Sequence, residues 1–145
     1  MKAVATWRGG IQTLLEDGRG HAVVVDLPTE EGGVDVGPSS LELNVLSLAG
    51  CITTIFTLVA KKRRFHFESM ELELEAERPD GAPTIAAVEG VFRLASSASA
   101  SDVETALRIT LRTCPVGVLY EKAGVPVHIR TVVVTPEPVA VRAHH

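Results

Sequence analysis

The sequence has only two cysteines, Cys51 and Cys114, among its 145 residues. No apolar signal segment is visible, because Met1 to Ala5 run directly into Trp7 and Arg8. We therefore expect a protein without an export signal. Two cysteines in such a chain do not make a disulfide scaffold, and they predict a reducing, cytoplasmic setting in which any disulfide is transient or catalytic.

Other chemical signatures are also missing. The chain has no CxxC motif, no clustered histidine ligands and no glycine-rich phosphate-binding motif. His21, His66 and His128 fall on separate strand-like stretches, so we expect no metal and no organic cofactor. The formal net charge of −4 argues against nucleic-acid binding, which requires a basic face.

The long apolar stretch from Val45 to Ala60 is short for a membrane span. It covers only about sixteen residues, whereas a bilayer requires roughly twenty. The basic cluster at 61–64 that follows resembles a membrane flank, but it is explained more simply by the favourable effect of cations at a helix C-terminus. We interpret the stretch as the central helix of a soluble domain, with no membrane partner.

This central helix is predicted over 38–62, with Cys51 in its middle. Ser39 and Glu42 have the spacing of a capping box, in which the serine oxygen and the glutamate each satisfy a backbone N–H. After Glu42, only Asn44 is strongly polar until Lys61. Because so little of the helix suits contact with water, we expect it to be buried between two copies of the chain in a homodimer.

The remaining elements predict an α+β fold with antiparallel sheets. The Asp17-Gly18 pair is a strong hairpin signal between strands at 11–16 and 21–27. The segment 70–77 alternates glutamate with apolar residues, so it is predicted to be a strand with one wet face. We expect one domain over 1–145. Its parts are N-terminal strands and a loop (1–37), the central helix (38–62), a hairpin (69–94), a second helical region (101–123) and a last strand (125–134).

The second helical region is predicted to contain two helices. A capping box at 101–104 opens the first, and Cys114 extends its apolar stripe. Pro115 breaks that helix and suits the first position of a new one, which is expected over 115–122 and stops at Gly124. The tail after Thr135 is interrupted by proline and ends in His144 and His145, which are either native or a tag remnant.

The two cysteines permit two interpretations. In the simpler one, both are small buried hydrophobic residues. In the other, a helix N-terminus at Pro115 stabilises a Cys114 thiolate, and Gly50 lets another element approach the sulfur of Cys51 closely. A thiolate with a second cysteine within reach is the minimum that a peroxide-reducing thiol enzyme needs.

Two motifs resemble the OsmC/Ohr family, named for osmotically inducible protein C and organic hydroperoxide resistance protein. The motifs are Gly37-Pro38-Ser39 leading to Leu48-Ala49-Gly50-Cys51, and Thr113-Cys114-Pro115-Val116. The resemblance extends from Trp7 to about Val134. It implies an intertwined homodimer whose sheets pack around the cysteine-bearing helix and whose active members reduce organic hydroperoxides. By this resemblance Cys51 is the peroxidatic thiol, Cys114 is the resolving thiol, and an external dithiol, often a lipoyl group, reduces their disulfide.

The chain departs from the family pattern at the glutamate and arginine that assist the reactive thiolate. The family's glutamate lies ten positions before the helix cysteine, where this chain has Leu41. Glu42 is the candidate here, although one helix position rotates a side chain by about 100° and capping also explains this residue. Arg8 is the first candidate arginine and Arg19 the second, and either is also explained as a solvated turn residue.

These departures keep a second function open. It is an OsmC-like dimeric binding or stress protein that retains the fold and the cysteines without efficient peroxidase activity. The apolar neighbours of Cys51 favour organic hydroperoxides over hydrogen peroxide, but a buried helix needs the same residues. They are Leu48, Ile52, Ile55 and Phe56.

Overall fold

The computed structural model describes residues 1–137, so most of the predicted tail, with His144 and His145, lies outside the described residues. The chain divides into two compact units, with the boundary between Ser47 and Leu48 inside the longest helix. Each unit is built around one three-stranded sheet, and whether the two units fold as the single predicted domain remains a prediction.

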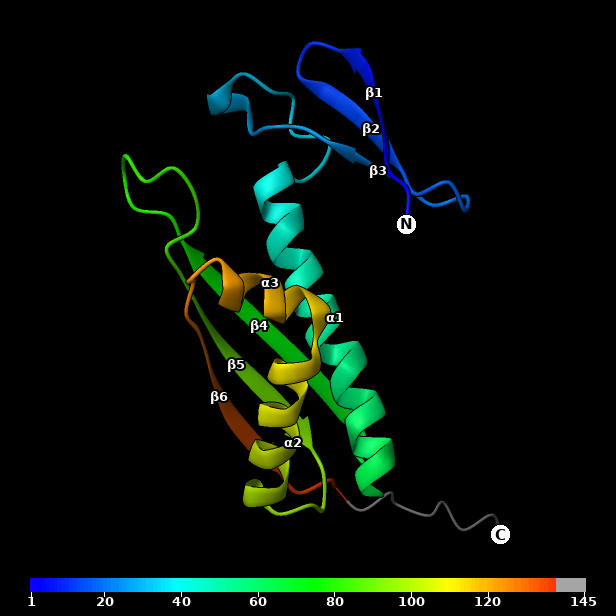
Figure 1. The fold of residues 1–145 in the computed structure, drawn as a ribbon, viewed down its shortest axis with the longest axis vertical. Helices are drawn as coiled ribbons and strands as arrows, with labels where there is room; N and C mark the ends of the chain where they lie inside the picture. Colours follow the sequence, from blue (N-terminus) through cyan, green and yellow to red (C-terminus); the bar gives the residue numbers. More distant parts are fainter. Residues whose placement is uncertain (138–145) are drawn as a thin grey trace, which may run out of the picture. The chain divides into compact units, whose positions relative to one another are not determined.

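The N-terminal unit contains an antiparallel sheet in the order β1-β2-β3 (Figure 1). As predicted, a turn at 17–21 joins the last two strands. The Asp17 carboxylate holds this turn by accepting the backbone N–H groups of Arg19 at 2.7 Å and His21 at 3.2 Å. The elements are β1 (Val4–Gly9), β2 (Gln12–Glu16), β3 (Ala22–Val25) and the short 3-10 helix η1 (Thr29–Glu31).

The buried carboxylate of Asp26 organises the loop that leads from β3 to the long helix. It accepts the N–H of Leu27 at 2.8 Å, that of Val34 at 3.3 Å and that of Val36 at 3.2 Å. Gly37 is required in the same loop, because a Cβ there would collide with the carbonyl oxygen of Val24. The glycine and acidic residues of this segment therefore fix a defined backbone path.

The long helix α1 (Ser40–Arg63) begins with the predicted capping box. The Ser39 Oγ accepts the Glu42 N–H at 3.1 Å, and the Glu42 carboxylate accepts the Ser39 N–H at 3.2 Å. The expectation that this stretch is too short to span a membrane is wrong, because α1 has 24 residues and is long and apolar enough by length and composition alone. The core helix of a soluble protein can have the same length and composition. One face of α1 is buried, through Leu48, Ile52, Phe56, Val59 and Ala60.

The C-terminal unit contains the second sheet, β4 (Ser69–Glu77), β5 (Ala87–Ala95) and β6 (Val127–Val134), in the order β4-β5-β6. The expectation of antiparallel sheets is correct for β4 and β5 but wrong for β6, which runs parallel to β5. The physical reason is the connection, because a helical crossover returns the chain to the same end of the sheet. That crossover consists of α2 (Ala100–Thr113) and α3 (Pro115–Lys122).

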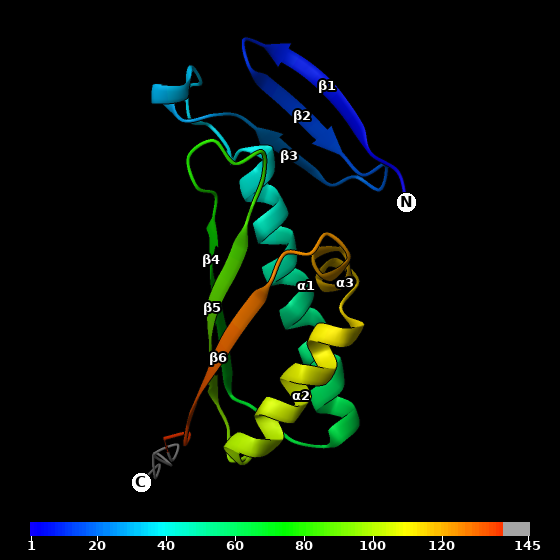
Figure 2. The ribbon, with the colours of Figure 1, turned by 60° about the vertical axis from the view of Figure 1, so that its left-hand side comes forward.

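Helices cover one face of this second sheet, and the predicted wet face is exposed. In Figures 1 and 2, α2, α3 and the C-terminal part of α1 lie on the same side of β4, β5 and β6. Phe56 of α1 packs on Phe92 of β5 with ring centroids 4.6 Å apart. Every second side chain of β4 points away from this core, which leaves Glu71, Glu73, Glu75 and Glu77 exposed.

The start of α2 differs from its prediction. The N-cap is Ser99 rather than Ser101, and its Oγ accepts the Asp102 N–H at 3.1 Å. Ser99 and Asp102 have the same three-residue spacing as Ser101 and Glu104, so the sequence contains two competing cap positions. The earlier one lets the helix begin two residues sooner than expected.

Candidate functional site

The structure brings together the two cysteines, which are sixty-three residues apart in sequence. The sulfurs of Cys51 and Cys114 lie 2.7 Å apart, and both are free cysteines. Cys114 is completely buried, whereas Cys51 is half-buried. The predicted proximity of the two thiols is therefore confirmed, and only Cys51 combines this proximity with access to solvent.

Cys51 lies in the middle of α1, one residue before the buried Ile52. Gly50 precedes it and is exposed, and a Cβ at that position would meet no atom within 4 Å. Cys114 does approach the Cys51 sulfur closely, but because a side chain at Gly50 would meet nothing, the missing side chain is not what permits this approach. The space beside Gly50 is open to a ligand or to a second molecule.

Cys114 forms the junction of two helices, as predicted. It is both the C-cap of α2 and the N-cap of α3, with Pro115 at the start of α3. Its backbone N–H donates to the Thr110 carbonyl at 2.7 Å, which closes α2, and Pro115 needs no N–H partner. The Cys-Pro pair therefore fixes the sulfur between the two helices and directs it at Cys51.

The Cys114 thiol is protonated at neutral pH, which corrects the expectation that the helix N-terminus stabilises a thiolate there. Burial and the hydrogen bond to Cys51 raise the pKa of Cys114 from 9.0 to about 11, against the opposing effect of the Gly117 N–H. The Cys114 thiol accordingly donates to the Cys51 sulfur. Cys51 is the acceptor of the pair.

Gly117 is a positioning residue that the sequence analysis missed. Its N–H donates to the Cys114 sulfur at 3.4 Å. A Cβ at Gly117 would lie 3.6 Å from that sulfur and 3.3 Å from the carbonyl oxygen of Leu111, so the glycine also keeps the junction compact. The available signal was its spacing, since a glycine three residues after an N-cap lies where the cap side chain accepts a backbone N–H.

The candidate arginines both lie in the N-terminal unit, at exposed positions. Arg8 is on β1, and within residues 1–137 it forms no ion pair. Arg19 is in the turn before β3, where its Nε lies 3.5 Å from a carboxylate oxygen of Asp17. Arg19 therefore already has a local ionic partner, whereas the Arg8 guanidinium is available for another one.

Glu42 also lies in the N-terminal unit, in the first turn of α1. Its carboxylate is occupied by the reciprocal hydrogen bonds of the capping box with Ser39. The roles of Glu42 and Arg8 beside the thiolate thus remain predictions.

Residues 31–130 match the family model described as OsmC-like protein. The chain belongs to the OsmC-like family. This match covers more than half of the sequence and includes both cysteines. No curated protein matches the chain by sequence.

Solved structures of the OsmC-like family share the fold at low sequence identity. An OsmC-like protein from Mycoplasma pneumoniae has a TM-score of 0.80 at 14% identity, over 92% of this chain and 96% of that one. An organic hydroperoxide resistance protein OsmC from Legionella pneumophila has a TM-score of 0.71 at 17% identity, over 92% and 98%. An organic hydroperoxide resistance protein from Elizabethkingia anophelis has a TM-score of 0.69 at 15% identity, over 94% and 97%. This OsmC-like chain thus has a fold that is shared with proteins named for hydroperoxide resistance.

Proposed function

We propose that this OsmC-like protein is a thiol-dependent peroxidase that reduces organic hydroperoxides. The observation that carries the proposal is the pairing of a half-buried Cys51 with a buried Cys114 at a sulfur separation of 2.7 Å. A sulfenic acid formed on Cys51 would then lie next to the Cys114 thiol that converts it to a disulfide. The names of the Legionella and Elizabethkingia structures give further support.

In the proposed cycle, the Cys51 thiolate attacks the distal oxygen of the hydroperoxide. The O–O bond breaks, the alcohol leaves after protonation, and Cys51 becomes a sulfenic acid. The Cys114 sulfur then attacks the Cys51 sulfur, which releases water and forms the Cys51–Cys114 disulfide. An external dithiol such as a lipoyl group reduces this disulfide by exchange and restores both thiols.

The surroundings of Cys51 support an organic substrate. Leu48, Ile52 and Phe56 are fully buried on the same helix, so the half-buried sulfur lies at the edge of an apolar core. An alkyl or aryl hydroperoxide carries apolar surface that it can bury at this edge, whereas hydrogen peroxide carries none. The proposed catalyst needs no metal or organic cofactor.

The same proposal includes a cytoplasmic homodimer with α1 at its interface. Leu46 is 58% exposed and Leu58 is 52% exposed, on a helix that has no continuous polar face. A second copy covering these side chains would remove apolar surface from water. It would also fill the open space beside Gly50.

Arg8 and Glu42 are proposed to assist Cys51 in this assembly, with Arg19 as the alternative arginine. Arg8→Ala is expected to slow hydroperoxide turnover, because it removes a cation available to a developing negative charge. Arg19→Ala is the matched control and should have little effect. A larger loss in Arg19→Ala would transfer the role to Arg19.

The proposed activity is tested by hydroperoxide consumption with an excess of dithiol. Cys51→Ser should abolish turnover, and Cys114→Ser should permit one oxidation without steady turnover. Cumene hydroperoxide should be consumed faster than hydrogen peroxide by the unchanged protein. If Cys51→Ser retains the rate of the unchanged protein, the proposal is wrong.

A second candidate function is a dimeric OsmC-like binding or stress protein without efficient peroxidase activity. Two observations favour it: Leu41 occupies the position of the family's glutamate, and Glu42 is engaged in its capping box. Leu41→Glu provides the test. A large gain in turnover would indicate that the natural chain lacks an essential catalytic group.

A further inference from the structure

A pocket at the C-terminal end of α1 lies apart from the cysteine pair. Ten residues separate Cys51 from Lys61, which is about 15 Å along a helix. The pocket has a volume of about 440 Å³, within the range of small-molecule sites. Its lining consists of Thr57, Ala60, Lys61, Arg64, Phe65, His66 and Phe67.

Aromatic residues and a fixed backbone form the apolar wall of this pocket. The rings of Phe65 and Phe67 pack on the buried Phe56, with centroid separations of 6.0 and 6.1 Å. The carbonyl of His66 accepts the Ser96 hydroxyl at 2.5 Å, and the Glu68 N–H donates to the Ala95 carbonyl at 2.8 Å. The wall is therefore preformed and needs no rearrangement to receive a ligand.

Arg64, which lines this pocket, has an unusual backbone conformation. Its φ of 59° is left-handed, and it occupies the position after the helix where glycine is usual. The Arg64 N–H donates to the Lys61 carbonyl at 3.3 Å and the Phe65 N–H to the Ala60 carbonyl at 3.2 Å, which is the Schellman arrangement. An arginine here carries a conformational cost that glycine avoids, so the position of its guanidinium requires an explanation.

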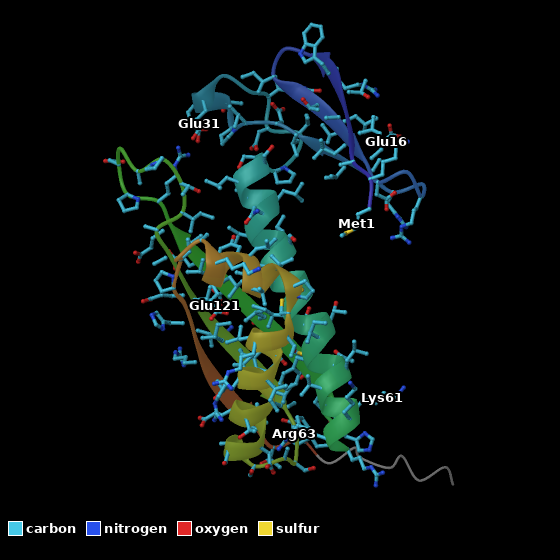
Figure 3. The ribbon with its side chains drawn as sticks, in the orientation of Figure 1. Met1, Glu16, Glu31, Lys61, Arg63 and Glu121 are labelled. Atoms are coloured by element: carbon cyan, nitrogen blue, oxygen red, sulfur yellow. The ribbon has the colours of Figure 1, made fainter. Side chains whose placement is uncertain are left out.

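The charges around the pocket are all of one sign. Lys61 and Arg64 line it, no carboxylate does, and neither of the two has an ion pair within the described part of the chain. Figure 3 shows Lys61 and Arg63 at this end of α1. The helix dipole explains a basic last turn, but it does not explain why Lys61 and Arg64 share a pocket with an aromatic wall.

We propose that this pocket binds a small organic acid, with its alkyl or aryl body against Phe65 and Phe67 and its carboxylate between Lys61 and Arg64. The guanidinium of Arg64 matches the planar carboxylate, and the ammonium of Lys61 adds a second donor. The apolar wall selects an amphipathic acid over an inorganic anion, because only the former covers the aromatic surface.

Calorimetric titration with decanoate tests this site in the full-length protein. The unchanged protein should bind decanoate with one site per chain. Lys61→Gln combined with Arg64→Gln should weaken the affinity by about tenfold, as expected for the loss of two charge-assisted contacts. Lys62→Gln combined with Arg63→Gln is the matched control. It removes the same charge from the same end of α1, from residues that do not line the pocket, and should change the affinity by less than about threefold.

A steric variant separates the pocket from general electrostatic attraction. Thr57→Phe should fill the cavity and abolish decanoate binding while all the cations remain. Vesicles of phosphatidylglycerol provide the alternative partner, a membrane surface. The proposal is overturned if decanoate does not bind, or if the two double variants lose decanoate affinity equally. It is also overturned if the protein binds vesicles but not decanoate and the two double variants weaken that vesicle binding equally.

Discussion

At the scale of single residues, burial separates the two thiols. Cys114 is fully enclosed, its pKa is raised to about 11, and it donates to Cys51. Cys51 is half-buried at the accepting end of this hydrogen bond. The environment of each residue, rather than its chemical type, therefore makes Cys51 the accessible thiol and Cys114 the enclosed one, as the proposed roles require.

The raised pKa of Cys114 predicts a pH dependence of stability. A thiol whose pKa is higher in the folded state contributes stability that is present below its ordinary value of 9.0 and is lost as the pH rises through about 11. Under reducing conditions, the free energy of unfolding should therefore fall more steeply between these values in the unchanged protein than in Cys114→Ala. Denaturant titrations at several pH values measure the difference. Equal slopes in the two proteins would show that Cys114 titrates normally.

At the scale of secondary-structure elements, the Asp26 carboxylate fixes the loop between β3 and α1. Burial alone would raise the pKa of Asp26, but the N–H groups of Leu27, Val36 and Val34 together lower it below 3.8. The stability that Asp26 contributes is thus present above the unfolded pKa and is lost as the pH falls through the folded value. The free energy of unfolding, measured as the pH is lowered, tests the lowered pKa of Asp26.

Asp26→Asn should destabilise this loop at neutral pH, because the amide group places a donor against backbone donors. The Val34 and Val36 amides should exchange hydrogen faster, and the variant should lack the loss of stability that the unchanged protein shows below about pH 4. Asp35→Asn is the matched control. It removes the same charge from the same exposed loop, at a left-handed position that asparagine tolerates, and should leave both measurements nearly unchanged.

The sequence predicts those features of the fold and the site that depend on residues close together in the chain. The helix break at Pro115, the capping box at Ser39 and the alternation in β4 depend on near neighbours, and the structure confirms all three. The direction of β6 depends on its pairing with β5, which no local pattern contains. The raised pKa of Cys114 likewise depends on burial by residues distant in sequence.

At the scale of the whole molecule, substitutions of Gly50 test the proposed homodimer. Glycine in the middle of a helix costs about 1 kcal/mol relative to alanine, and nothing in the described chain requires it at this position. In an isolated chain, Gly50→Ala should therefore be stabilising. In a dimer that packs against this position, Gly50→Leu should shift the protein to monomers at micromolar concentration. Sedimentation velocity measures the change, and a monomeric unchanged protein would refute the dimer.

The most direct test of the central claim is the mass of the protein after one equivalent of organic hydroperoxide. The short sulfur separation predicts that the chain loses two hydrogens and that peptide mapping finds an intramolecular Cys51–Cys114 disulfide. Cys114→Ser should instead gain one oxygen at Cys51, or more on overoxidation. If both thiols of the unchanged protein stay reduced under excess hydroperoxide, the peroxidase account is contradicted.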